Sequence, residues 1–308
     1  MGSEGDESFA EIVVDPGVGS TPSPSPSPSP GPERGEFVLT LGKGEKVDPE
    51  REKRLFERVK ERFDWAKANL SPVDTAPVTS INQRAAVHGV VTPPEVCAPI
   101  REALVIAEKT GGAFDPTFTG GSCDRVDFRK VEVRDTPFAV KHPPCTVRFT
   151  EAGMRLDLET FARAWALDRA AQLLREEGLT HFLLRVGSLG VAAGTWEVPL
   201  PEGAPAKVIS ITDRAFAGAM DPDTRIVDPG NCRPVPGNRA ALILAPTATE
   251  SLGFSRAAVT REPSAAVKWL TSQGASGVVR QGEGVVSTED LRPILWPPPP
   301  PDAGFRFP

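Results

Sequence analysis

The amino-acid sequence predicts an α+β fold. Short runs with the alternating or apolar character of strands lie among longer segments with helical periodicity, and the two kinds do not alternate strictly as β-α-β units would. No internal repeat is present. Of the 308 residues, 39% are apolar, which is sufficient to build a buried core.

Four runs are predicted to be strands because their residues are apolar or alternate with polar ones. They are residues 37–41, 182–186, 208–211 and 240–244. A hairpin is expected near the C-terminal end of the body, where the segments 278–280 and 285–286 flank a turn at residues 282–284.

Helices are predicted between these strands. Asp48 and Pro49 are typical of a helix start, since the aspartate can cap free N–H groups and proline needs no N–H at the first position. Apolar residues then recur every three or four positions: Leu55, Val59, Phe63, Ala66 and Leu70. Further helices are expected over residues 94–110, 160–177 and 265–271, the first ending at Gly111 and Gly112 and the second at Gly178.

Proline marks the two ends of the chain. Seven of the 33 prolines lie between Pro16 and Pro32, including a Ser-Pro run from Ser23 to Pro30, and six lie from Pro297 onward. Proline removes backbone donors and favours the extended polyproline II conformation. We therefore expect a disordered segment at residues 1–35, a body at residues 36–296 built of two interleaved subdomains with a central cleft, and a Pro-rich tail at residues 297–308. The two ends are interpreted as linkers.

Charge and hydropathy exclude several classes of function. The net charge of −6 argues against a partner bound through nucleic-acid phosphates. No window is apolar enough for a membrane-spanning helix, and no export signal is expected in the chain as written. Cys97, Cys123, Cys145 and Cys232 form no C-x-x-C pair, so the sequence indicates neither a zinc site nor a redox motif, and it fixes no compartment.

Three segments are candidates for chemistry. Residues 111–117 follow a helix and contain two glycines, which let the backbone approach a ligand, together with Asp115 and Thr117. A purely structural turn is the alternative for this segment. Residues 155–168 lead a strand into a helix, whose N-terminus favours a phosphate. Residues 225–235 carry Arg225 and Asp228 into a turn.

The order and spacing of these segments resemble the FAD:protein FMN transferases, also called ApbE-like proteins. Residues 112–117 match the family's G-A-F-D-P-T element, which is the most specific likeness. Four further stretches are similar to family motifs in the same order: residues 70–82, 156–170, 186–190 and 226–234. Each fragment is weak alone, but five in the right order indicate membership.

The resemblance implies an α+β fold related to T-fold proteins, with FAD in a cleft between subdomains and Mg²⁺ at its diphosphate. In the family, FMN is transferred from FAD to a Thr or Ser hydroxyl of an acceptor flavoprotein, leaving AMP, and many members are exported. A divalent cation suits this reaction, because breaking a phosphoanhydride requires charge neutralisation on the reacting oxygens.

The resemblance assigns roles to individual positions. The cofactor-binding positions are Ala113, Phe114, Asp115, Thr117, Arg163, Arg225, Ile226 and Asp228. The metal-binding positions are Ala162, through its backbone carbonyl, and Ser251 and Ser255, which stand where the family has Asp and Thr. Glu250 is one residue away and is a candidate substitute for the missing carboxylate. No catalytic residue is assigned.

The chemical groups of the family motifs are mostly replaced. The family's lysine is Arg163, its Gly-Gly-Asp reads Gly187-Ser188-Leu189, and no tyrosine exists anywhere in the chain. A serine hydroxyl supplies neither charge nor a useful base near neutral pH. We therefore predict a transferase-family fold with reduced or absent catalysis. The alternative is a non-catalytic module that binds a flavin, a nucleotide or a protein.

Overall fold

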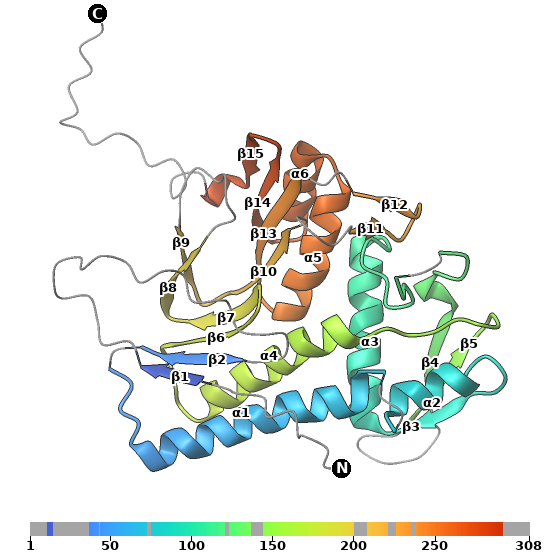
Figure 1. Ribbon diagram of the computed structural model, residues 1–308, viewed down its shortest axis with the longest axis horizontal. Helices are drawn as coiled ribbons and strands as arrows, with labels where there is room; N and C mark the ends of the chain where they lie inside the picture. Colours follow the sequence, from blue (N-terminus) through green and yellow to red (C-terminus); the bar gives the residue numbers. More distant parts are fainter. Residues whose placement is uncertain are drawn as a thin grey trace, which may run out of the picture.

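An eight-stranded mixed sheet organises the larger part of the molecule (Figure 1). The computed structural model describes residues 11–14, 37–42, 44–72, 75–120, 123–136, 144–199, 208–220, 226–235 and 238–291. The strands of the sheet, in spatial order, are β1 (Glu11–Val14), β2 (Val38–Leu41), β6 (Phe182–Val186), β7 (Leu189–Ala193), β10 (Ala215–Met220), β13 (Arg239–Ala245), β14 (Ser276–Gln281) and β15 (Gly284–Ser287). Only the β1–β2 pair is parallel.

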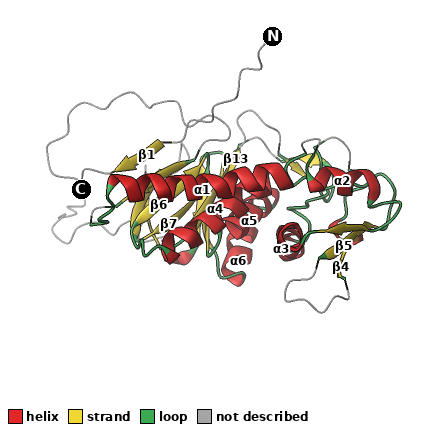
Figure 2. Ribbon diagram, turned by 90° about the horizontal axis from the view of Figure 1, so that it is seen from below, coloured by secondary structure: helices red, strands yellow, loops and turns green. Residues whose placement is uncertain are grey.

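Four helices cover one face of this sheet (Figure 2): α1 (Pro49–Leu70), α4 (Glu159–Glu176), α5 (Ala248–Thr260) and α6 (Pro263–Ser272). The side chains of Phe182, Leu184 and Val186 in β6 point into this helical layer, whereas Leu183 between them joins a cluster on the opposite face. That opposite face is covered by a two-stranded ribbon of β8 (Thr195–Pro199) and β9 (Val208–Thr212). The sheet is therefore buried on both sides at its centre.

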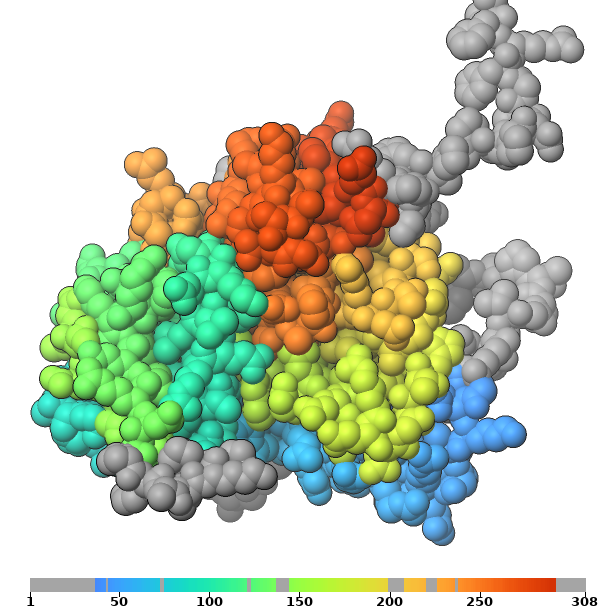
Figure 3. Space-filling model, turned by 180° about the vertical axis from the view of Figure 1, so that it is seen from behind, coloured from blue at the N-terminus to red at the C-terminus, as the bar shows by residue number. Residues whose placement is uncertain are grey.

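A second lobe contains α2 (Pro77–Arg84), α3 (Pro94–Thr110), a short 3-10 helix at Phe128–Lys130, and a small sheet with the order β3 (Val90–Thr92), β5 (Cys145–Phe149), β4 (Val131–Asp135). Figure 3 shows this green part of the chain gathered beside the orange α5 and α6. A disulfide between Cys97 and Cys145 ties α3 to β5 inside the lobe. The remaining elements are the β11 (Val227–Asp228) and β12 (Arg233–Pro234) hairpin and a 3-10 turn at Glu289–Leu291.

The predicted helices and strands are largely confirmed. The α1 helix begins at Pro49, and the Asp48 side chain accepts a hydrogen bond from the Arg51 N–H at 2.8 Å. The α3 helix spans the predicted residues, and Gly111 ends it in the left-handed conformation with φ of 68°. The β14–β15 hairpin also lies where the sequence placed it.

Several elements differ from the sequence expectations. The segment 1–35 was predicted to lack regular structure, but Glu11–Val14 forms β1 and pairs with β2. The helices α2 and α5 and the strands β3, β4, β5, β7, β8, β10, β11 and β12 were not predicted. Short segments carry too little periodicity to be recognised, and α5 is buried on nearly all sides, so it lacks the pattern of one apolar face. The expected Pro-rich tail at residues 297–308 lies outside the described residues. Among the described residues, the helices are too short or too polar to cross a membrane.

One buried carboxylate joins the helices α4 and α5. The Asp168 side chain on α4 is 9% exposed and accepts hydrogen bonds from the backbone N–H groups of Ala248 (2.7 Å) and Thr249 (3.0 Å), and from the Thr249 hydroxyl (3.0 Å). These donors are the free N–H groups at the start of α5, so Asp168 satisfies that helix end across 80 residues of sequence.

Burial raises the pKa of Asp168 to about 6, although its three hydrogen bonds oppose the shift and Glu102 nearby adds to it. Because the pKa in the folded state lies above the ordinary value of 3.8, the native state binds this proton more tightly than the unfolded chain does. The stability that this group contributes is complete below about pH 4 and is lost as the pH rises through 6.

We expect Asp168→Asn to remove this pH dependence. Between pH 4 and pH 7 the free energy of unfolding of the wild type should fall, relative to the variant, by about 2 kcal/mol, which is most of the effect of a pKa shift from 3.8 to about 6. Chemical denaturation at a series of pH values measures it, and Glu61→Gln on the exposed face of α1 is the control. If the free energies of unfolding of wild type and Asp168→Asn change in parallel with pH, the pKa of Asp168 is not raised in the folded state.

Candidate functional site

The most specific sequence motif forms a tight loop at the C-terminal end of α3, which we call the 111–117 loop. Gly111 and Gly112 both have positive φ, 68° and 86°, a conformation that favours glycine. The backbone N–H of Gly112 donates to the Ala107 carbonyl at 2.8 Å and so closes the helix. The chain then turns at once toward Asp115 and Thr117, as the sequence suggested.

The polar groups of the loop are used within it. Asp115 is 8% exposed, and its Oδ1 accepts hydrogen bonds from the Thr117 N–H (2.8 Å) and the Thr117 hydroxyl (2.6 Å). Its Oδ2 accepts from the Phe128 N–H at 3.0 Å. Thr117 is also buried, and its hydroxyl accepts from the Asp127 N–H. Asp115 and Thr117 therefore hold the shape of the loop, while the adjacent Ala113 and Phe114 remain half-buried.

The loop is attached to the start of α4. The Asp157 N–H donates to the Pro116 carbonyl at 2.8 Å, and the rings of Phe114 and Phe161 lie 5.9 Å apart. Ala162 follows Phe161 in the first turn of α4 and is 3% exposed. Arg163, the next residue, pairs with Glu159 of the same helix at 2.9 Å. The structure thus brings the first and second candidate segments together.

The third candidate segment is the β11–β12 hairpin. Ile226 is buried. The Asp228 carboxylate accepts from the Gly230 N–H (2.9 Å) and from the Asn231 side-chain amide (2.7 Å), and so builds the turn. Arg225, a predicted cofactor-binding residue, lies outside the described residues.

Two contacts that the sequence did not indicate join this hairpin to the 111–117 loop. A disulfide links Cys123, which follows the loop, to Cys232 in the hairpin. The Arg261 guanidinium donates to the carbonyl of Thr110, just before the loop, at 2.9 Å and lies near Asp228. Burial lowers the pKa of Arg261, and Asp228 opposes this shift. Three segments that are distant in sequence therefore converge.

The disulfides correct the sequence analysis, which assigned the cysteines no role. All four are paired, and their sequence separations of 48 and 109 residues carry no signal that could have revealed the pairing. Disulfides are typical of proteins that fold in an oxidising compartment.

Two of the expected metal positions, Ser251 and Ser255, lie on α5, where their hydroxyls are already bonded. Ser251 is 0% exposed and donates to the Thr247 carbonyl at 2.9 Å, and Ser255 is 1% exposed and donates to the Leu252 carbonyl at 2.8 Å. Glu250 projects elsewhere and pairs with Lys109 of α3, with 2.7 Å between Nζ and Oε1. Lys109 is a residue that the sequence analysis did not single out.

These residues do not fit a divalent cation. A hard cation prefers several anionic or carbonyl oxygens, whereas here two neutral hydroxyls are directed at their own helix and the carboxylate is neutralised by an ammonium group. In the part of the chain that the structure describes, no group of three or more His, Cys, Asp or Glu side chains is arranged to hold a metal ion. The expected metal roles of Ala162, Ser251, Ser255 and Glu250 stay predictions without support from this geometry.

A sequence profile of the ApbE family matches residues 41–279. The chain belongs to the ApbE family. Two curated relatives are named FAD:protein FMN transferase: that of Treponema pallidum is 28% identical over 180 aligned residues, covering 46% of this chain and 49% of the relative, and that of Klebsiella pneumoniae is 25% identical over 153, covering 42% and 44%. The ApbE-family chain thus spans about half the length of the curated relatives it matches.

Solved structures agree on the fold of this ApbE-family chain. The ApbE protein from Thermotoga maritima has a TM-score of 0.68 at 20% identity, covering 82% of this chain and 93% of that one. The flavin transferase ApbE from Vibrio cholerae has a TM-score of 0.66 at 14% identity, covering 82% and 93%. The predicted α+β, ApbE-like fold class is confirmed.

We expect Asp115→Asn to destabilise the protein by about 1–3 kcal/mol, because one of the carboxylate oxygens becomes an NH₂ group that faces a donor N–H. Urea denaturation measures the loss, with Glu61→Gln as the matched control on the exposed face of α1. A variant as stable as the wild type would mean that Asp115 does not hold the loop.

Proposed function

We propose that this ApbE-family chain binds a flavin dinucleotide, and that Mg²⁺-dependent transfer of FMN to an acceptor flavoprotein is reduced or lost. The proposal is carried by one observation: the side chains at the family's metal positions are committed to other contacts. Ser251 and Ser255 donate within α5, and Glu250 pairs with Lys109.

The energetic argument concerns the charge near the start of α5. A bound Mg²⁺ would need anionic oxygens to offset the cost of losing its water ligands. Glu250 is the carboxylate that the sequence offers as a substitute metal ligand, and its side chain is only 19% exposed beside the Lys109 ammonium. Asp168 also lies near the start of α5, but its oxygens already accept from the N–H groups of Ala248 and Thr249. Binding a cation through Glu250 would require this pair to break and would place a second positive charge beside Lys109. Repulsion between the two cations opposes that arrangement.

The positions expected to contact the flavin keep more of the family's residues than the positions expected to hold the metal. Internal hydrogen bonds maintain the 111–117 loop, and Ala113 and Phe114 are half-buried, so that they would contact the ring system of a flavin. Asp115, Thr117 and Asp228 would act by shaping the loop and the hairpin, since their polar atoms already have partners. The binding roles of Arg163 and Ile226 stay predictions. In this proposal the chain keeps the pocket and lacks the metal chemistry.

Titration with FAD, in the presence of 
Mg²⁺ and in the presence of EDTA, tests the proposal. We expect binding in both conditions with dissociation constants that agree within about twofold, because no cation bridges the diphosphate to the protein. Chromatography of the same samples should detect no AMP above a protein-free control.

Other outcomes distinguish the alternatives. Binding that strengthens at least tenfold with Mg²⁺, together with AMP release, would overturn the proposal in favour of an active transferase. No binding of FAD in either condition would overturn the flavin role and favour a module that interacts with a protein.

We expect Ser251→Asp to create a dependence on Mg²⁺. The new carboxylate would be fully buried, so the variant should lose about 3–5 kcal/mol of stability in EDTA, and 10 mM Mg²⁺ with saturating FAD should restore part of the loss. Thermal unfolding measures both effects. Ser251→Asn is the control, since it adds similar volume without charge. If Mg²⁺ stabilises neither variant, residue 251 does not correspond to the family's metal ligand.

A further inference from the structure

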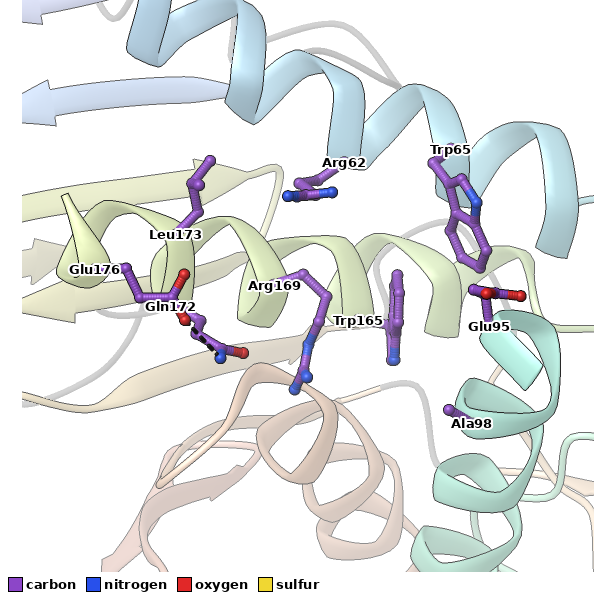
Figure 4. A pocket seen from close by; sticks show the side chains of 9 residues that line it. All are labelled: Arg62, Trp65, Glu95, Ala98, Trp165, Arg169, Gln172, Leu173 and Glu176. Carbon is purple, nitrogen blue, oxygen red and sulfur yellow. Dashed lines mark hydrogen bonds between the residues drawn. The ribbon is translucent and has the colours of Figure 1, made fainter. Parts of the chain in front are cut away.

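A cavity of about 350 Å³ lies between α1, α3 and α4 (Figure 4). Trp165 and Arg169 belong to the family-like stretch 156–170, but no position with an expected cofactor or metal role lines the cavity. Trp65 of α1 and Trp165 of α4 form its aromatic wall, and the buried Leu173 adds an apolar surface. None of Ala113, Ala162 and Ser251 lines it. The cavity is therefore distinct from the candidate flavin site, and the inference below does not depend on flavin binding.

The two tryptophans form a pair with unused donors. Their ring centroids are 5.1 Å apart at an angle of 35°, so the rings support each other and leave no gap for a flat ligand between them. Both side chains are half-buried, and neither indole N–H donates to any residue that the structure describes. Neither nitrogen is among the buried side-chain atoms without a partner, so both N–H groups are accessible and free to donate to a ligand. Trp196, by contrast, donates to the Ala193 carbonyl at 2.8 Å.

The charged groups of the cavity also offer donors. Arg62 and Arg169 line it, and neither forms an ion pair with a described residue; the Arg169 guanidinium lies 5.6 Å from the Trp165 ring. Indole and guanidinium groups can only donate hydrogen bonds. Glu95 and Glu176 also line the cavity, so two positive and two negative groups balance and no strong field selects a small anion. The chemistry fits an uncharged ligand rich in acceptors.

A proline-rich polypeptide has this character. Proline has no N–H, and in the polyproline II conformation its carbonyls point outward, unpaired with any other backbone group. Such segments dock into aromatic-lined grooves because they lose little entropy on binding. This chain contains one in its Ser-Pro run, residues 23–30, which lies outside the described residues.

We propose that the cavity binds the Ser-Pro run of the same chain. The described chain resumes after the run at Phe37, which stacks on Phe63 of α1 at 4.9 Å, and Phe63 is the neighbour of Arg62 in the sequence. Residues 15–36 join Val14 to Phe37. Half of that connection, in the polyproline II conformation at about 3.1 Å per residue, reaches about 34 Å. A helix is about 10–12 Å across, so the run can pass over α1 to the cavity.

The C-terminal prolines are less well placed. Leu291, the last described residue, packs with Leu183 and Val198 on the sheet face opposite α4. A segment that starts there would have to travel around the sheet before it reached Trp165. The N-terminal run therefore has the shorter path.

The test uses a synthetic peptide of residues 21–34 and a full-length variant that carries Pro24→Ala, Pro26→Ala, Pro28→Ala and Pro30→Ala. The peptide should bind this variant, shifting the indole NMR signals of Trp65 and Trp165 but not that of Trp196. Its apparent affinity for the wild type should be at least about tenfold weaker, because the tethered run has an effective concentration in the millimolar range. Equal affinity for both proteins, or no binding to either, would overturn the proposal.

Two substitutions in the Pro→Ala variant locate the contact. Trp165→Phe keeps an aromatic ring but removes the N–H, and it should weaken peptide binding at least fivefold. Trp196→Phe removes an indole that lies outside the cavity, and it should leave binding unchanged. Circular dichroism verifies that both proteins fold. Equal peptide binding by the two proteins would contradict the donor role of Trp165.

Discussion

The hydrogen bonds of Asp168 to the start of α5 are the constraint on which the arrangement of the helical layer depends. A buried carboxylate is costly unless donors surround it, and the free N–H groups of a helix N-terminus supply them together with a favourable dipole. The bonds fix where α5 begins relative to α4, and hence where Glu250 and Ser251 lie relative to Ala162. Thr249 extends the contact to α3, because its hydroxyl also lies 2.8 Å from Glu102.

Contact between α3 and α5 is close as a result. A Cβ added at Gly253 would lie 2.1 Å from the Ile106 side chain, so glycine is required for this approach of the two helices. Farther along, Lys109 meets Glu250, and Arg261 meets the Thr110 carbonyl. The helix on which the sequence analysis placed Ser251 and Ser255 as metal positions is joined to α3 by the ion pair between Glu250 and Lys109. This packing explains how a family fold persists while the polar groups of its motifs serve as structural bonds.

Much of the fold could be predicted from local sequence. Asp48 and Pro49 begin α1, Gly111 ends α3, and the predicted strand at residues 240–244 is the centre of β13, because capping, glycine conformation and apolar periodicity act over a few residues. The strand β1 was missed because its four residues form a strand only through their pairing with β2, which is distant in the sequence. The order of the family motifs was likewise sufficient to predict membership.

The sequence alone determined the α+β class and the family, since both follow from residue identity and order. The replacement of the family's metal-binding carboxylate at Ser251 stays a prediction. Only the tertiary structure decided what the remaining polar groups do. Asp115 could have faced a ligand or its own loop, and Glu250 could have faced a cation or a lysine. Which partner a side chain meets depends on contacts between residues that are from 2 to 141 positions apart, as for Thr117 and Lys109. The disulfide between Cys123 and Cys232 could not be predicted from the sequence either, because the fold, and not the spacing of the cysteines, brings the two sulfur atoms together.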